Sequence, residues 1–202
     1  LRIYKHYSLN FKNVKSVTTS MSSYPGTLTS NDDYYVTDTG LSLIETTNNV
    51  FNMSIYAAVT PQSLLYWVRV MVAQRLADNG KDWTAVFSRY NSGTYNNQYM
   101  VVDFKRYSPG ASLAPGTLWV AEQIPGLVQR ADVTDVLQSQ GYWASFNIPY
   151  FKNIYALSGF TAMKLKQGSY WSYTEYARPE IFARQAPNVS DLAGMQRLMR
   201  YN

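Results

Sequence analysis

The clearest hydrophobic pattern in the chain predicts an amphipathic helix that starts at Pro61 and ends before Asn79-Gly80. Thr60 is expected to cap this helix, and Pro61 to occupy its first position. The apolar residues that recur at helical spacing on one face are Leu64, Leu65, Val68, Met71, Val72 and Leu76. The pattern therefore predicts that this face is buried.

Short runs of β-prone residues, separated by turn residues, predict strands in two groups. Residues 34–37 and 41–47 are expected to form a hairpin, because Asp38-Thr39-Gly40 is a short loop that contains glycine. The second group comprises residues 98–104, 117–122, 127–130 and 142–147. Strands that follow one another in this way favour antiparallel pairing.

Further helices are expected at residues 82–90, with Asp82 as cap, at 132–140, and from 149 to about 159. The last predicted helix is capped by Asn188 or Ser190. Four of its apolar residues are expected to be buried: Leu192, Met195, Leu198 and Met199. Helices that fall between groups of strands indicate an α+β fold with a largely antiparallel sheet.

No internal repeat, low-complexity segment or linker divides the sequence, so residues 1–202 are expected to form a single domain. Leu1 is not an initiator methionine, and the sequence stops directly after the last predicted helix. No signal-peptide pattern opens the chain. We therefore expect a partial domain, an internal fragment with any targeting signal outside it.

Composition excludes several classes of protein. Hydrophobic residues make up 46% of the 202 residues and aromatic residues 15%, which is enough to bury a core and excludes intrinsic disorder. No apolar run approaches the roughly 18 residues that a membrane span requires. The sequence has no cysteine and one histidine, His6, which excludes a disulfide framework, a thiolate zinc site and a cysteine nucleophile within these residues.

The formal net charge of +5 comes from basic residues that are scattered along the chain. Because no run of them forms a phosphate-binding stripe, no nucleic-acid partner is expected. Asp32-Asp33 is interpreted as a loop or cap pair, and neither a metal nor another cofactor is expected. A Ser–His–acid triad would depend on His6 alone, and the sequence contains neither a G-x-S-x-G elbow nor a P-loop.

Several asparagines are candidates for substrate binding. Asn91, Asn96 and Asn97 lie in a dense polar run, residues 89–99, whose amides can bond to local turns or line a substrate pocket. Asn147 lies between a predicted strand and a predicted helix. There its amide can cap backbone groups or donate to a developing oxyanion.

Two further asparagines, Asn52 and Asn188, begin N-x-[ST] sequons and are glycosylation candidates. Asn188 can equally serve as a helix cap. If both sequons are occupied, the protein passes through the secretory pathway.

Longer blocks of the sequence resemble the phospholipase B-like family, which includes the laminin-ancestor proteins. Six blocks carry the similarity, in the same order and over essentially the whole chain: residues 23–26 (SYPG), 43–47 (LIETT), 91–98 (NSGTYNNQ), 122–126 (EQIPG), 142–151 (YWASFNIPYF) and 197–202 (RLMRYN). So many blocks in one order make chance a poor explanation.

This resemblance implies an N-terminal-nucleophile hydrolase with an αββα sandwich, incomplete in this chain. It implies that a precursor cleaves itself and that a cysteine at the new N-terminus attacks an acyl carbonyl, with its own α-amino group as base. That cysteine and a following histidine are expected shortly before Leu1, outside this sequence. The implied substrate is a phospholipid or another acyl compound, the implied partners are the remaining segments of the same precursor, and the implied location is the lysosome or outside the cell.

The resemblance also implies roles for three residues of this chain. Thr47 matches the active-site threonine, Asn147 the asparagine that helps to form the oxyanion hole, and Arg178 the arginine that closes the pocket. An amide donor and a guanidinium can stabilise a tetrahedral oxyanion and orient a polar head group. Without the resemblance, Thr47 would simply end a strand, and Arg178 would pair with Glu175 or Glu180.

Because the nucleophile is absent, this fragment alone is expected to be inactive. Two alternatives to the phospholipid hydrolase stay open. One is a catalytically inactive member of the family that serves as a structural or binding glycoprotein. The other is an amidase on the same fold.

Overall fold

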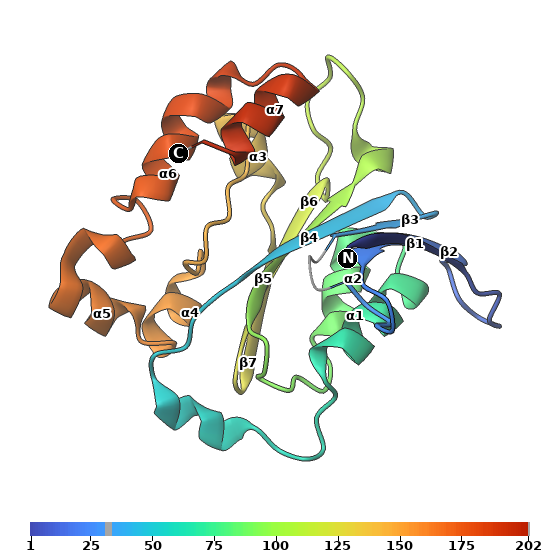
Figure 1. Cartoon of the computed structure of the whole chain (residues 1–202), viewed down its shortest axis with the longest axis horizontal. Helices are drawn as coiled ribbons and strands as arrows, with labels where there is room; N and C mark the ends of the chain where they lie inside the picture. The colour runs from blue at the N-terminus through green and yellow to red at the C-terminus, as the bar shows by residue number, and fades with distance from the viewer. Residues whose placement is uncertain (31–33, 202) are drawn as a thin grey trace.

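The computed structural model describes residues 1–30 and 34–201. Within them, seven strands form one antiparallel sheet whose spatial order follows the chain from β1 to β7 (Figure 1). The strands are β1 (Ile3–Ser8), β2 (Thr18–Ser23), β3 (Tyr34–Thr37), β4 (Leu41–Thr47), β5 (Asn97–Asp103), β6 (Leu118–Ile124) and β7 (Leu127–Asp132). The largely antiparallel sheet and the hairpin of β3 and β4 are therefore confirmed.

Helices cover both faces of this sheet, which confirms the α+β class (Figure 1). Between β4 and β5 the chain forms α1 (Tyr66–Leu76) and α2 (Gly80–Phe87), which pack on one face. On the other side follow α3 (Thr134–Gln140), α4 (Lys152–Leu157), α5 (Phe160–Gln167), α6 (Ala177–Gln185) and α7 (Leu192–Met199). The described residues thus supply one sheet of an α+β sandwich, with four short 3-10 helices at Met53–Ala58, Phe104–Arg106, Gly168–Trp171 and Ala186–Asn188.

Alternation along the central strands divides the core between the two faces of the sheet. Tyr99 of β5 points toward α2, where its ring packs against Trp83 and Phe87. Met100 points the other way and belongs to the cluster that includes Ile154 of α4. Because successive residues of a strand face opposite sides, a strand covered by helices on both faces is buried along its length.

The first two helices begin at other residues than the pattern predicts. α1 begins later, because the backbone N–H of Leu64 donates to the carbonyl oxygen of Tyr90 and so cannot join a helix. α2 begins at Gly80, because its cap is Asn79 and not Asp82. The side-chain oxygen of Asn79 accepts a bond of 2.9 Å from the backbone N–H of Asp82.

The predicted buried face of α1 is wrong. Arg69 and Arg75 are buried instead, because their guanidinium groups donate to backbone carbonyls, that of Arg69 to Phe87 and that of Arg75 to the loop before β2. A buried charge is tolerated where hydrogen bonds replace water in this way. Four apolar residues of the predicted face are 41–55% exposed: Leu64, Leu65, Val72 and Leu76.

Residues 142–147, predicted as a strand, form none. They lie against interior strands, where Ser145 bonds to Thr46 of β4 and the indole N–H of Trp143 donates to Gln98 of β5 at 3.1 Å. Because β4 and β5 already have a partner on each side, they offer no free edge for pairing. The strands predicted at 98–104, 117–122 and 127–130 are confirmed as β5, β6 and β7, and the helix predicted at 132–140 as α3. The helix predicted from Pro149 is α4, which begins later, at Lys152, because its N-cap is Phe151.

The last predicted helix is confirmed as α7, but its cap is Asp191, which accepts a bond of 2.6 Å from the backbone N–H of Gly194. Leu198 is buried as predicted. The other three residues of the predicted buried set are exposed: Leu192, Met195 and Met199.

No helix within residues 1–30 and 34–201 is long and apolar enough to cross a bilayer. Asp32 and Asp33, predicted as a loop or cap pair, lie outside the described residues.

Candidate functional site

Three residues that lie far apart in the sequence line one pocket of about 270 Å³, which we call the polar pocket. Thr47 is the last residue of β4, Asn147 lies between α3 and α4, and Arg178 lies in the first turn of α6. Most of the remaining lining is aromatic, and the residues that complete the polar pocket are Phe146, Tyr170, Trp171, Tyr176, Asn49 and Ile148.

Asn147 joins the other two residues through its side-chain amide. Its Nδ2 donates to the backbone carbonyl of Thr47 at 2.7 Å, and its Oδ1 accepts a bond of 2.6 Å from Nη1 of Arg178. The backbone φ of +68° is left-handed, a conformation that asparagine tolerates better than most residues. An amide nitrogen carries two hydrogens, and the bond to Thr47 uses one of them. The second can donate to a ligand in the polar pocket.

Arg178 donates to Asn147 in the polar pocket and not to a neighbouring acid. Glu175 forms an ion pair of 3.1 Å with Lys164, and that bond lowers the pKa of Glu175. Pairing of Arg178 with Glu175 or Glu180 is not among the ion pairs of the described residues. Because a guanidinium carries five N–H donors, Arg178 can bond to Asn147 and still donate to an anionic or polar group.

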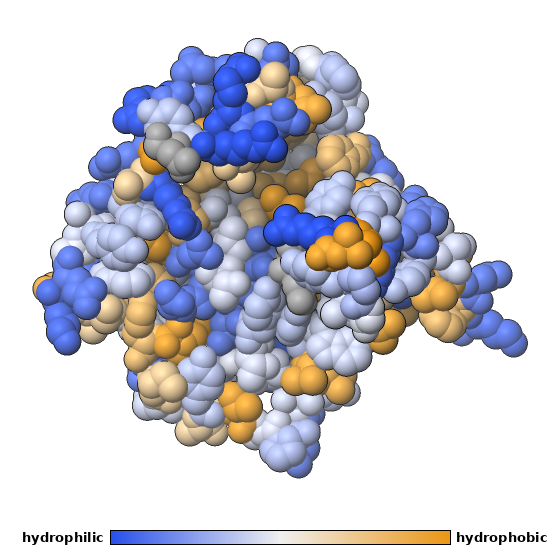
Figure 2. All heavy atoms as spheres, in the orientation of Figure 1, coloured by the Kyte–Doolittle hydropathy of each residue, from blue (hydrophilic) through white to orange (hydrophobic). Residues whose placement is uncertain are grey.

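An apolar groove of about 330 Å³ lies between β4, β5 and the helices α6 and α7. In Figure 2, hydrophobic atoms in orange lie at the back of a hollow below the helices at the top of the view. The apolar residues that line the groove include Ile44, Met100, Phe182, Val189, Met195, Leu198 and Met199. Two of the residues predicted to be buried in α7, Met195 and Met199, therefore face this groove.

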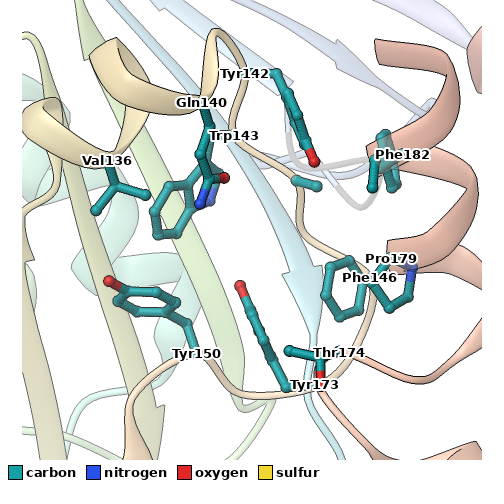
Figure 3. A pocket seen from close by; sticks show the side chains of 12 residues that line it. Val136, Gln140, Tyr142, Trp143, Phe146, Tyr150, Tyr173, Thr174, Pro179 and Phe182 are labelled. Atoms are coloured by element: carbon teal, nitrogen blue, oxygen red, sulfur yellow. The ribbon is translucent and has the colours of Figure 1, made fainter. Parts of the chain in front are cut away.

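An aromatic cavity of about 210 Å³ shares lining residues with the polar pocket and with the apolar groove, and Figure 3 shows its lining. Phe146 lines both the aromatic cavity and the polar pocket, whereas Trp143 and Phe182 line both the cavity and the groove. The hydroxyl of Tyr173 points into the cavity (Figure 3). Burial raises the pKa of Tyr173 above its ordinary value, so this hydroxyl stays protonated and can donate. Through these shared residues the cavity adjoins both of its neighbours, and the lining is more apolar in the groove than in the polar pocket.

The structure does not bring Asn91, Asn96 and Asn97 into the polar pocket. Asn91 donates to the carbonyl of Ile124 at 2.8 Å, and Asn96 donates to that of Gly93 at 2.9 Å. These amides stabilise the loop before β5 and its contact with β6. Asn97 pairs directly with Thr47 in the register of β4 and β5, so the loop supports the strand that carries Thr47. The role of these three asparagines in lining a substrate pocket stays a prediction.

The two sequon asparagines differ in their surroundings. Asn52 is half-buried; its side chain caps the first 3-10 helix through Ser54 and donates to the carbonyl of Leu157 at 3.1 Å. Asn188 is exposed, and its amide donates to the carbonyl of Arg184 at 3.2 Å. Glycosylation of either residue stays a prediction.

Sequence reasoning missed Glu122, a fully buried carboxyl group of β6 that lies beside the segment carrying Asn147. Its oxygens accept bonds from the backbone N–H groups of Tyr150 and Phe151 at 2.7 and 3.0 Å. Burial raises the pKa of Glu122 to about 7, although these bonds favour the charged form. The available signal was an acidic residue at the end of a predicted strand that is otherwise apolar.

Comparison with known proteins gives a consistent result. A sequence profile of the family described as Phospholipase B matches residues 1–202. The chain is 47% identical to phospholipase B-like protein B of Dictyostelium discoideum, 48% identical to phospholipase B-like 1 of Homo sapiens and 45% identical to phospholipase B of Crotalus adamanteus. Each alignment covers 100% of this chain but only 36% or 37% of the relative. The chain therefore spans little more than a third of the length of these relatives.

Proposed function

Because the chain belongs to the phospholipase B family, we propose that it forms part of an acyl hydrolase that removes acyl chains from phospholipids. The observation that carries this proposal is the meeting of Thr47, Asn147 and Arg178 in the polar pocket. The amide of Asn147 donates to the oxyanion, and Arg178 orients that amide and attracts the phosphate of a head group. Thr47 fixes the amide through its carbonyl oxygen.

The nucleophile of this proposal is a cysteine outside the chain, at an N-terminus that self-cleavage of the precursor exposes. Its thiol gives its proton to the α-amino group, and the thiolate forms a bond to the acyl carbon while the carbonyl π electrons move to oxygen. Collapse of the oxyanion expels the glycerol oxygen, which takes the proton back. Water then hydrolyses the thioester and releases the fatty acid. An amide that bonds more strongly to the oxyanion than to the carbonyl accelerates both steps.

The apolar groove supports a substrate with a long acyl chain. A chain that extends from the polar pocket through the aromatic cavity would bury its methylene groups among Met100, Phe182 and Leu198. Each buried methylene contributes about 0.8 kcal/mol, so kcat/KM is expected to rise with acyl length. A small amide without an acyl chain would gain nothing from the groove, so the groove favours a lipid substrate over a small amide.

The test uses the full-length parent protein and vesicles of phosphatidylcholine, with free fatty acid measured by mass spectrometry. Asn147→Ala is expected to lower turnover by about 10²-fold or more. Asn10→Ala, a change of the same kind at an exposed residue after β1, is the matched control. If the folded wild-type parent releases no fatty acid, the result supports the inactive glycoprotein. If the parent cleaves N-acyl amides faster than esters, the result supports the amidase.

We also propose that the parent protein is a lysosomal or secreted glycoprotein. The exposed sequon at Asn188 supports this location, because glycans attach to accessible asparagines in the secretory pathway. The parent is expected to lose mass on treatment with an endoglycosidase, and Asn188→Gln to lose one glycan. Unchanged mass would contradict this part of the proposal.

A further inference from the structure

Glu122 bonds to residues that adjoin two lining segments of the polar pocket, which we call its two halves. Its side chain is fully buried, yet no ion pair among the described residues includes it. Four N–H donors converge on its carboxyl group instead, from three different segments of the chain. Burial of a carboxyl group costs free energy, and hydrogen bonds from these donors offset that cost. Such an arrangement connects the three segments through one side chain.

The first half is the segment that carries Asn147. Tyr150 and Phe151 follow Asn147 by three and four residues, and their backbone N–H groups donate to Oε1 and Oε2 of Glu122 at 2.7 and 3.0 Å. Pro149 lies between them and Asn147, and its ring fixes one backbone torsion of the connection. Glu122 therefore fixes where the segment of Asn147 returns to the sheet.

The second half is the end of β4. Asn48, which follows Thr47, is 3% exposed, and its Nδ2 lies 3.4 Å from Oε1 of Glu122. Gln98 faces Glu122 across β5 and β6 and donates to the same oxygen at 2.6 Å. Gln98 also accepts the bond from the indole of Trp143, so the network continues into the segment that precedes Asn147.

Asn48 has a further property that fits this position. Within the described residues its Oδ1 is buried and has no hydrogen-bond partner. Rotation of the amide by half a turn would bring this acceptor to the place where Nδ2 now faces Glu122. The charged carboxylate then has a donor in Asn48, and the protonated carboxyl has an acceptor in the same side chain.

We infer that Glu122 is a positioning residue, which sets the placement of Asn147 relative to Thr47. It does so by bonding to the segment that follows Asn147 and to Asn48, the residue after Thr47. The consequence for turnover rests on the proposed function, whereas the anchoring of residues 150 and 151 does not. Neither residue belongs to a strand or helix, so ordinary secondary structure would not protect their amides.

The test measures residue-resolved hydrogen exchange and turnover of phosphatidylcholine on the full-length parent protein. Glu122→Gln keeps the shape of the side chain but replaces an acceptor by a donor. Whichever way the new amide is turned, the N–H of Tyr150 or Phe151 loses its acceptor. We expect exchange at these two amides to become about tenfold faster or more and kcat to fall more than KM rises. Asp135→Asn, an exposed acid of α3, is the matched control and is expected to change neither.

Protected amides in the wild type that lose protection in Glu122→Gln, together with lower kcat, support the inference. Unprotected amides at 150 and 151 in the wild type overturn it, and this result needs no variant to fold. Exchange or turnover of Glu122→Gln equal to the wild type also overturns it. A wild type without turnover would contradict only the proposed function, because the exchange measurement still tests whether Glu122 anchors the amides of residues 150 and 151.

Discussion

Arg178 donates a hydrogen bond of 2.6 Å to the side-chain oxygen of Asn147, 31 residues before it in the sequence. The same amide donates to the carbonyl of Thr47, 100 residues earlier. One asparagine thus connects the end of a sheet strand to the first turn of α6. Because both of its polar atoms are bonded, its amide is oriented before a substrate arrives, which is the condition for electrostatic stabilisation of a transition state.

Two substitutions at Asn147 separate the role of its side-chain amide from the strain of its backbone. Its φ of +68° is strained for alanine but not for glycine. Asn147→Ala is therefore expected to lower the free energy of unfolding by about 1 kcal/mol more than Asn147→Gly. Both variants lose the donor and should lose similar turnover. Thermal unfolding and fatty-acid release on the full-length parent measure the two effects, and turnover retained in the glycine variant alone would contradict the role of the amide.

Arg178→Lys tests recognition of the head group. Lysine keeps the charge but not the fork of N–H donors that bonds to Asn147 and to a phosphate at once. We expect kcat/KM for a phospholipid to fall about tenfold relative to a neutral ester with the same acyl chain. Arg184→Lys, on the same helix, should leave this ratio unchanged. Equal losses on both substrates would show that Arg178 does not contact the phosphate.

Gly93 is expected to tolerate no side chain. Its φ is +65°, and an added Cβ would lie 2.5 Å from the Cα of Pro125. Gly110 has a similar φ of +78° but nothing within 4 Å of an added Cβ. Gly93→Ala should therefore lower the free energy of unfolding by about 3 kcal/mol or more, and Gly110→Ala by about 1 kcal/mol. Chemical denaturation compares them, and equal losses would mean that the contact with Pro125 is unimportant.

Glu122 should make stability depend on pH. Burial raises its pKa to about 7 in the folded protein, from about 4.3 in an unfolded chain. The groups that face it are the amides of Gln98 and Asn48, the backbone N–H groups of Tyr150 and Phe151, and the phenol of Tyr173, whose pKa is itself raised and which stays neutral over this range. The folded state holds the proton more tightly, so its contribution is fully present below about pH 4.5 and is lost as pH rises to about 7.

The size of this contribution is on the order of 4 kcal/mol, because the two pKa values differ by nearly three units and each unit corresponds to about 1.4 kcal/mol. Unfolding of the full-length parent, measured at intervals between pH 4.5 and pH 8, should show stability falling over this range. Glu122→Gln should flatten that fall, because glutamine does not titrate. A profile with the same slope in the variant would assign the dependence to other groups.

Local patterns predicted much of the fold. Gly40 and the β-prone runs around it predicted the hairpin of β3 and β4, and apolar runs predicted β5 to β7. The errors arose where distant groups decide. Arg69 turns inward because the carbonyl of Phe87 accepts its bonds, and no helical pattern contains that information. Residues 142–147 form no strand because the strands they contact are already paired.

The candidate site could be predicted only in part. A resemblance between sequences indicated Thr47, Asn147 and Arg178, and the structure brings these residues together. Composition and periodicity alone left Asn147 open between a cap and a donor. Glu122 was missed because its four donors come from segments that only the folded chain brings together.

Trapping of an acyl-enzyme is the sharpest test of whether acyl groups are transferred at the polar pocket. The full-length parent is mixed with an activated acyl ester, and the covalent adduct is followed by mass spectrometry over a single turnover. We expect an acyl group on the cysteine at the mature N-terminus, formed about 10²-fold more slowly in Asn147→Gly. An adduct that forms equally fast in Asn147→Gly, or none on that cysteine, would contradict it.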